Sequence, residues 1–253
     1  MSSEEEPVGE TSGPSWTLIG AVLVVGVVVA MGVILSIQGL RSDDDRPVAS
    51  SPSSSSQAPT TGSTESVCGL RGHEKSGRLT KAPDATWSLI EGFAVPSSRV
   101  AGPGEVDDDG FRYCYARTPE GAALSAANFI GVGSKGGPER ESKILEHLVA
   151  PGPGRETLEK RASSSPVAED DGTASSNPDT RIQIAGLRMS SYTDSEANLE
   201  ILMRANNGSY VAQQFELRWA EGDWRVAFGD DGTALSEPRS VADATGFLPW
   251  SGA

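Results

Sequence analysis

The sequence predicts an α+β domain that stands outside the cell membrane on a single transmembrane helix and a flexible tether. Three observations predict this class. Residues 16–40 lack charged side chains, residues 48–66 are rich in Ser and Thr, and the apolar period changes from helical to alternating near residue 182. Helices that precede a run of strands are typical of α+β domains, so we expect helices packed on a four-stranded antiparallel meander.

Residues 16–40 form the predicted membrane span. At 1.5 Å per residue a helix of this length reaches about 37 Å, which exceeds the bilayer hydrocarbon core of about 30 Å. A cleaved signal peptide is the alternative, and it would begin with a basic region. Residues 1–15 instead carry four Glu and no Lys or Arg. We therefore expect a retained, single-pass anchor that is integral to the membrane.

The orientation of this span follows from two opposed signals. Arg41 and Arg46 follow the span, and the positive-inside rule then favours a cytoplasmic C-terminus. The Ser/Thr/Pro-rich segment and the Cys pair beyond it are typical of an oxidising exterior. We favour the second signal, which places the acidic tail of residues 1–15 in the cytoplasm and the C-terminal domain outside the cell.

Residues 41–67 are the predicted tether. Eight Ser, three Thr and two Pro occur among the nineteen residues 48–66, a composition that cannot bury a core. A flexible chain of this length has a mean reach of about 30 Å. Small residues four apart in the span, such as Gly26 and Ala30, are typical of close helix packing. They are also common in aliphatic spans, so a homo-oligomer stays an open alternative.

Composition excludes several kinds of site in the domain beyond the tether. The chain has two His and two Cys, too few for a zinc finger or an iron–sulfur cluster. Its net charge is −14, and residues 68–253 carry 19 basic and 27 acidic side chains. Nucleic-acid binders show clustered basic charge instead, so we expect no direct nucleic-acid binding.

Cys68 and Cys114 are predicted to form a disulfide. They are the only cysteines in the chain, so one intramolecular pairing exists. A reactive thiol is the alternative, and it would need a nearby His or basic partner. Closing this loop should stabilise the domain by about 4 kcal/mol on the chain-entropy model.

Three helices are expected after residue 117. Thr118 is a suitable N-cap with Pro119 at the first helical position, and glycines from Gly131 onward end this first helix. A second helix starts at Pro138 and a third spans residues 153–162. We interpret residues 163–180 as a loop.

Four strands are expected from residue 182 onward. A bulge at Ala185-Gly186 reconciles the opposite parity of the apolar residues on either side of it. In the next two strands a three-residue loop pairs Leu199 with Phe215 and Met203 with Val211. In the last hairpin, paired residue numbers have a constant sum of 443 around a Glu221-Gly222 loop. These last predicted pairs are Trp219–Trp224, Leu217–Val226 and Phe215–Phe228.

No motif in the chain predicts catalysis, a cofactor or a metal. Residues 131–136 match G-x-G-x-x-G, but a helix precedes them where a dinucleotide site needs a strand. Asp107 and Asp109 resemble the start of a calcium loop whose twelfth position lacks the required Glu. His73 and His147 have no local partner that suggests a triad. Trp219 and Trp224 could line a pocket, although core packing is the more ordinary role of alternating aromatic residues.

Several short phrases occur in a fixed order along residues 68–253. They include Cys68-Gly69-Leu70, Thr86-Trp87 with Pro96 after it, Ala101-Gly102-Pro103-Gly104, Tyr113-Cys114-Tyr115-Ala116-Arg117-Thr118-Pro119-Glu120-Gly121-Ala122-Ala123 with Ala126-Ala127-Asn128-Phe129, Gly152-Pro153-Gly154-Arg155, Gly222-Asp223-Trp224-Arg225-Val226 and Gly246-Phe247-Leu248-Pro249-Trp250-Ser251-Gly252-Ala253. These phrases resemble a group of uncharacterised single-pass proteins encoded on actinobacterial integrative and conjugative elements. The resemblance implies a place among conjugative type IV secretion components, similar to inner-membrane scaffold subunits with a nuclear transport factor 2-like cone. Those scaffolds have no obvious counterpart to residues 68–117.

The expected function is that of a non-enzymatic, membrane-anchored scaffold or accessory component of a conjugative DNA-transfer apparatus. Its partners would be other subunits of the transfer channel. The alternative is a tethered cone-fold domain that binds a small apolar ligand or acts as a surface sensor. The expected organisation is an acidic tail, a span, a tether, a disulfide-linked strand and loop region and an α+β cone domain, over residues 1–15, 16–40, 41–67, 68–117 and 118–253.

Overall fold

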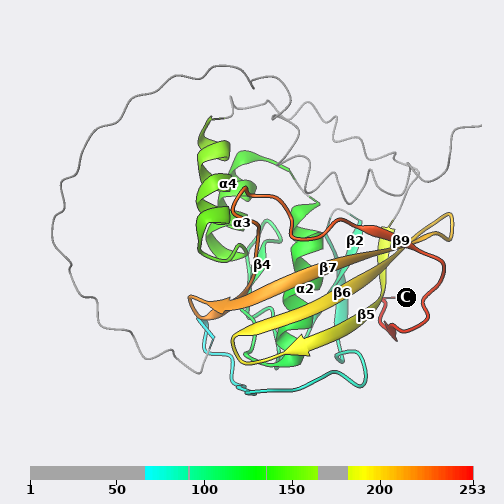
Figure 1. Ribbon diagram of the computed structural model, residues 1–253. Helices are drawn as coiled ribbons and strands as arrows, with labels where there is room; N and C mark the ends of the chain where they lie inside the picture. Colours follow the sequence, from blue (N-terminus) through cyan, green and yellow to red (C-terminus); the bar gives the residue numbers. More distant parts are fainter. Residues whose placement is uncertain (1–65, 91, 135, 165–181, 253) are drawn as a thin grey trace, which may run out of the picture.

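The computed structural model describes residues 66–90, 92–134, 136–164 and 182–252. The predicted acidic tail, the membrane span and nearly all of the tether lie outside these residues. Within the described ranges, every helix is too short or too polar to cross a membrane. The described residues divide into a large antiparallel sheet, three helices and two small hairpins (Figure 1).

The large sheet has six strands. Four consecutive strands pair antiparallel from β5 to β8, β10 adds to the outer edge of β5, and β9 pairs with β7. The sheet therefore recruits two short strands from the last fifteen residues described. The strands are β5 (Ile182–Tyr192), β6 (Glu196–Ala205), β7 (Tyr210–Ala220), β8 (Asp223–Val226), β9 (Arg239–Val241) and β10 (Leu248–Pro249).

The helices begin where the caps and prolines predict. Helix α2 (Pro119–Gly133) has Thr118 at its N-cap, whose hydroxyl accepts a hydrogen bond from the Gly121 backbone N–H at 3.1 Å. Helix α3 spans Pro138–His147 and helix α4 spans Pro153–Ser164. The three predicted helices are thus confirmed, and α4 runs two residues beyond the predicted end.

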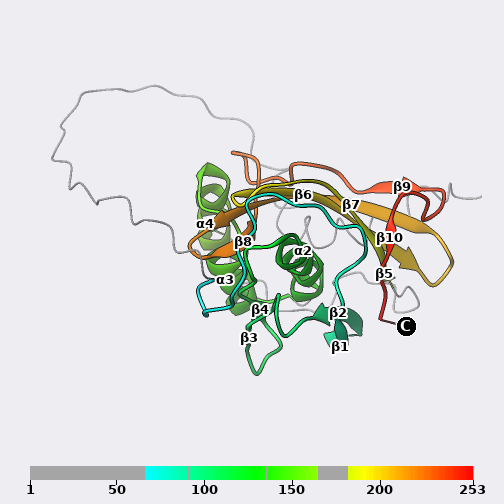
Figure 2. The same ribbon diagram turned by 90° about the horizontal axis from the view of Figure 1, so that it is seen from below.

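Two small hairpins cover the side of α2 that faces away from the sheet. They consist of β1 (Thr86–Ile90) with β2 (Phe93–Ser97), and β3 (Glu105–Val106) with β4 (Arg112–Tyr113). Figure 2 shows α2 between the large sheet and these hairpins. The approach is close at Gly131, where an added Cβ would lie 2.2 Å from Cγ1 of Val95. Helix α2 therefore forms the middle layer of the molecule.

The core lies between α2 and the inner face of the large sheet. Phe129 of α2 meets Phe215 of β7 edge to face at 6.0 Å between ring centroids. Trp224 of β8 is fully buried, and its indole N–H donates to the Ala116 carbonyl at 3.0 Å. Side chains of both layers thus fill the interior. Other fully buried members include Leu124, Leu187, Leu199, Ile201 and Leu217.

The predicted architecture, helices on a four-stranded meander in a cone, is wrong. The sheet has six strands because β9 and β10 join it. Only α2 lies across the sheet, while α3 and α4 pack on each other beside β8 (Figure 2). Strands of two and three residues carry no alternation that a sequence reading can detect, and their pairing partners are far away in the chain.

Most of the predicted pairing is confirmed. The register shift between Ile184 and Gly186 is the predicted bulge, and β6 pairs with β7 as expected. Trp219 pairs with Trp224 and Leu217 with Val226. The third pair of that hairpin is wrong, because β8 ends at Val226 and Phe228 forms an isolated bridge with Ala234.

Candidate functional site

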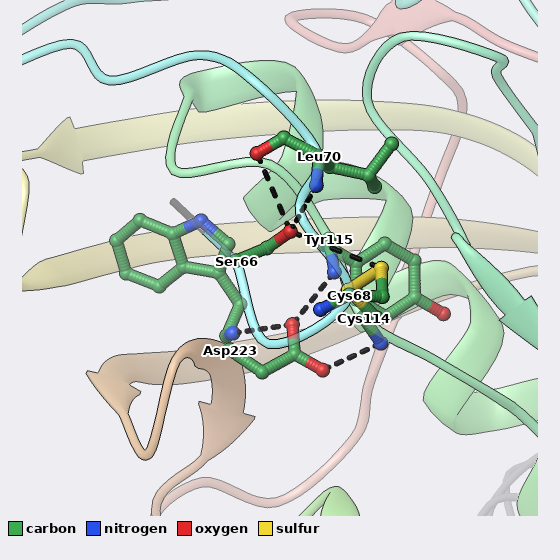
Figure 3. The surroundings of a disulfide bond; sticks show 7 residues. Ser66, Cys68, Leu70, Cys114, Tyr115 and Asp223 are labelled. Atoms are coloured by element: carbon green, nitrogen blue, oxygen red, sulfur yellow. Dashed lines mark hydrogen bonds between the residues drawn. A yellow bond between two sulfur atoms is a disulfide. The ribbon is translucent and has the colours of Figure 1, made fainter. Parts of the chain in front are cut away.

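The disulfide site lies where the chain enters the domain, and we define it as Ser66, Cys68, Cys114, Tyr115 and Asp223. The predicted disulfide between Cys68 and Cys114 is present, and both cysteines are thereby accounted for (Figure 3). On its near side the Ser66 hydroxyl accepts a hydrogen bond from the Leu70 N–H at 2.7 Å. The first residues of the domain are thus held by both covalent and polar contacts.

A carboxylate beneath the disulfide organises the backbone around it. Asp223 Oδ2 accepts the Cys114 N–H at 2.6 Å, and Oδ1 accepts the N–H groups of Tyr115 and Trp224, each at 2.8 Å (Figure 3). Cys114 has a φ of 69°, in the left-handed region that non-glycine residues rarely adopt. The carboxylate of Asp223 therefore stabilises an unfavourable backbone conformation at the disulfide.

Burial changes the acidity of Asp223. Its side chain is almost fully buried, and this burial raises the pKa of its carboxyl to about 7, against the three backbone N–H groups that lower it. Burial also raises the pKa of the Tyr115 hydroxyl well above its usual value. With a pKa of about 7, the carboxyl of Asp223 changes its protonation state near neutral pH while it holds the disulfide segment in place.

The disulfide also requires a glycine. A Cβ built on Gly104 would lie 2.3 Å from Sγ of Cys68, and its backbone N–H donates to the Cys114 carbonyl at 2.7 Å. A side chain at this position would collide with the sulfur, which the disulfide holds in place. Gly104 is therefore part of the structural requirement for the Cys68–Cys114 bond.

The position of the disulfide determines which residues carry a force applied to the chain before Cys68. The Val67 N–H donates to the Gly222 carbonyl at 2.8 Å, so the entering chain is also fixed to the β7–β8 turn. A pull on the chain before Cys68 passes through the disulfide into Cys114 and misses residues 69–113. Both small hairpins therefore lie in a covalently closed loop outside that path.

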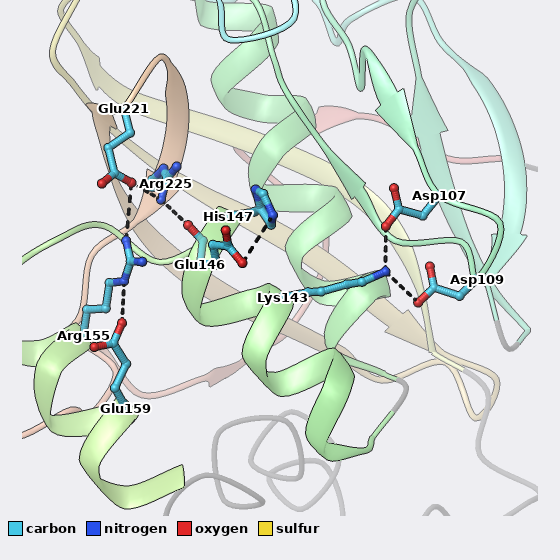
Figure 4. Close-up of polar contacts among 9 residues, drawn as sticks. All are labelled: Asp107, Asp109, Lys143, Glu146, His147, Arg155, Glu159, Glu221 and Arg225. Carbon is cyan, nitrogen blue, oxygen red and sulfur yellow. Dashed lines mark hydrogen bonds and ion pairs between the residues drawn. The ribbon is translucent and has the colours of Figure 1, made fainter. Parts of the chain in front are cut away.

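The candidate calcium residues are paired with cations instead. Lys143 Nζ lies 2.7 Å from Asp107 Oδ2 and 3.4 Å from Asp109 Oδ2, and Arg140 lies 3.6 Å from Asp109 (Figure 4). These pairs connect the β3–β4 turn to α3. In the part of the chain that the structure describes, no group of three or more His, Cys, Asp or Glu residues is arranged to hold a metal ion.

The two histidines lie in separate surroundings. His147 lies against the ring of Tyr113 at 4.5 Å between centroids, and 3.8 Å from the Glu146 carboxylate. His73 Nε2 lies 3.1 Å from Asp194 Oδ2, and the Arg117 guanidinium donates to the Asp194 backbone carbonyl. These contacts join the N-terminal segment to the β5–β6 turn.

The remaining sequence candidates have structural roles. Gly131 and Gly133 belong to α2 and Pro138 opens α3, so the G-x-G-x-x-G match begins inside a helix and does not follow a strand. Trp219 is half-buried under the Arg117 guanidinium at 5.2 Å, and it meets Trp224 at 5.4 Å. The tryptophan pair is thus part of the packed core and its rim.

A chain of ion pairs attaches α3 and α4 to the sheet. Arg155 of α4 contacts Glu159 at 2.9 Å and Glu221 at 3.4 Å, and Glu221 lies 2.5 Å from Arg225 of β8 (Figure 4). Arg225 also donates to the Glu146 carbonyl at the end of α3. Charged groups therefore connect the β7–β8 hairpin to both helices.

Sequence reasoning missed Asp223. The predicted register of the last hairpin places Asp223 beside a two-residue turn, a position where an acidic residue is usually solvated. The available signal was its place directly before the first large apolar residue of a strand. Its partners at residues 114 and 115 are 109 and 108 positions away in the chain, so no local pattern identifies them.

The fold and the disulfide site define a disulfide-stapled α+β domain. The chain belongs to the family described as domain of unknown function DUF8175, whose model matches residues 47–249. No curated protein and no solved structure matches the chain. The family match includes the disulfide site, both small hairpins and all six strands of the large sheet.

Proposed function

We propose that this chain is a non-enzymatic, membrane-anchored scaffold or accessory component of a conjugative DNA-transfer apparatus. The anchor is the predicted span of residues 16–40, with the domain outside the cell. The proposal starts from the resemblance to proteins of conjugative elements. The observation that carries it is the disulfide at the point where the tether enters the domain.

The disulfide suits a domain that is held from its N-terminal end while partners bind it. Because the bond connects Cys68 to Cys114, tension along the tether bypasses both hairpins. Those hairpins then keep their shape whether or not the anchor is pulled.

The bypassed loop also carries exposed apolar side chains. Leu89, Val100 and Val106 are 71%, 75% and 52% exposed, and all three lie between Cys68 and Cys114. Exposed apolar side chains are a common feature of protein contact sites. We therefore assign the contact with other channel subunits to the hairpin region.

A small apolar ligand in the interior is the less favoured alternative. The space between α2 and the sheet is occupied by Phe129, Phe215 and Trp224. The buried carboxylate of Asp223, a group that such a pocket would need free, already accepts three backbone N–H groups. Both observations favour a structural interior.

Deletion of the gene in its native host tests the proposal. We expect the frequency with which the element transfers to recipient cells to fall, and a copy of the gene supplied in trans should restore it. A deletion strain that transfers at the wild-type frequency would contradict the proposed function.

A further inference from the structure

Arg112 of β4 is a buried cation that forms no ion pair with any carboxylate of the described residues. Its exposed fraction is 9%, and its guanidinium donates to two neutral hydroxyls, Ser97 Oγ at 2.8 Å and Ser88 Oγ at 2.7 Å. The other two buried arginines of the described ranges have acidic partners. Arg140 pairs with an aspartate, Asp109, and Arg225 pairs with a glutamate, Glu221.

Burial of this charge without a counter-charge destabilises the folded state. A guanidinium stays protonated at neutral pH, although burial lowers the pKa of Arg112 from its usual value. Hydroxyl groups satisfy hydrogen bonds but supply no negative charge. A buried charge is ordinarily paired. An anion that bound to Arg112 would therefore offset the free-energy cost of burying its charge.

The groups around Arg112 have unused donors. Arg112 Nε is buried without a hydrogen-bond partner, and so is the hydroxyl of Tyr115. Tyr115 lies close enough to Arg112 for the two groups to interact electrostatically. Because Ser88 and Ser97 accept hydrogen bonds from Arg112, their own hydroxyl hydrogens remain to donate. A set of donors with spare hydrogens around one cation is the chemistry of an anion site.

The two serines are the members of this group that lie nearest to solvent, at the first hairpin. Ser88 lies on β1 and is exposed, and Ser97 lies at the end of β2 and is half-buried. Arg112 reaches this hairpin from β4, which is the inner strand of the second hairpin (Figure 2). An anion would therefore approach beside β1, and a local movement of the first hairpin would be needed for it to reach the buried Arg112 Nε and Tyr115 hydroxyl.

We propose that Arg112, Ser88, Ser97 and Tyr115 form a binding site for a phosphate group. The guanidinium fork presents parallel N–H groups that match two oxygens of a tetrahedral oxyanion. The hydroxyls supply further donors to the remaining oxygens. Free phosphate is the expected source, since the acidic charge of residues 68–253 opposes approach to an anionic lipid surface.

Calorimetric titration of the full chain in neutral detergent with inorganic phosphate tests the site, with potassium chloride at matched ionic strength as the reference. We expect saturable binding, and a melting temperature raised by about 5–10 °C when phosphate is about a hundredfold above its Kd. Arg112→Met should weaken binding at least about tenfold. The Arg112→Met variant should keep the fold, because the substitution removes a buried charge that has no counter-charge.

Two further variants separate the site from general charge effects. Ser88→Ala with Ser97→Ala keeps the cation and should weaken phosphate binding severalfold, which keeps the test valid if Arg112→Met does not fold. Arg99→Gln removes an exposed cation near the same hairpin and should leave the Kd unchanged. Absence of saturable phosphate binding, or equal affinity in the wild type and the double serine variant, would overturn the proposal.

Nanodiscs distinguish the source of the phosphate group. With free phosphate as the ligand, the melting temperature rises on addition of phosphate and is the same in phosphatidylcholine discs with or without phosphatidic acid. A rise caused by phosphatidic acid alone, and abolished by Arg112→Met, supports the same site and assigns the phosphate to a lipid head group.

Discussion

At the scale of single residues, Asp223 makes the stability of the disulfide site depend on pH. The pKa of its carboxyl is about 7 in the folded protein, against a usual value of 3.8. Between these values the folded state holds a proton that the unfolded chain has released. Stability contributed by this group is therefore present below about pH 4 and is lost as the pH rises toward 7.

Asp223→Asn should remove this component of the pH dependence. The amide cannot ionise, and its NH₂ group would face the Cys114 N–H in place of an accepting oxygen. We expect a loss of about 1–3 kcal/mol in the free energy of unfolding for the unsatisfied donor. Urea unfolding at several pH values measures this. The difference between wild type and variant should shrink from pH 4 to pH 7, and a constant difference would contradict the assignment.

Gly104 gives a second prediction at the same scale. In Gly104→Ala the new methyl group would meet Sγ of Cys68 at 2.3 Å, so we expect the disulfide to form incompletely and the domain to lose stability. Gly136→Ala is the matched control, because its Cβ would have open space and its φ is ordinary. Free thiols counted under denaturing conditions measure the effect. Equal thiol content in both variants would contradict it.

At the scale of elements, the C-terminal segment fastens the two sides of the molecule. Trp250 follows β10; its indole N–H donates to the Pro83 carbonyl at 3.1 Å, and its ring meets that of Trp87 of β1 at 5.5 Å. Its backbone N–H donates to the Ala185 carbonyl in β5. This one residue therefore links the edge of the large sheet to the first hairpin.

Substitutions of Trp250 separate packing from hydrogen bonding. Trp250→Ala should cost about 3–5 kcal/mol because it leaves a cavity, whereas Trp250→Phe should cost about 1 kcal/mol for the lost hydrogen bond. In the alanine variant, hydrogen exchange should also rise at Gly186 and Leu187, which pair with β10. Equal costs for the two variants, or unchanged exchange there, would show that Trp250 does not hold this edge.

The elements divide into those that sequence patterns predict and those that they do not. Helices α2 to α4 have proline starts, β5 to β7 are long enough to show alternation, and β8 is identified by its pairing with β7. Strands β3, β4, β9 and β10 have only two or three residues, and contacts with residues far away in the chain hold them and the first hairpin in place. Around β4 the buried residues do not alternate with exposed ones. Phe111 and Arg112 are both buried although they are neighbours in the chain. Cys114 and Tyr115 are also both buried, because the chain turns at Cys114, which has a left-handed backbone conformation.

At the scale of the whole molecule, the parts form an order along the chain. The predicted span and tether lead into the disulfide site, the disulfide closes a loop with both hairpins, and α2 joins that loop to the large sheet. Ion pairs hold α3 and α4 at the side of β8 (Figure 4). We therefore expect the sheet layer to be rigid and the hairpin layer to make the proposed contact with partners.

Complementation of the deletion strain with surface variants tests this division most directly. The variant Leu89→Ser, Val100→Ser and Val106→Ser changes exposed side chains only, so its stability and membrane level should equal those of the wild type. We predict that it lowers the transfer frequency about tenfold or more, as expected when buried apolar contacts are lost. Leu235→Ser, an exposed position between β8 and β9, should restore wild-type transfer. Full transfer with the triple variant would contradict the account.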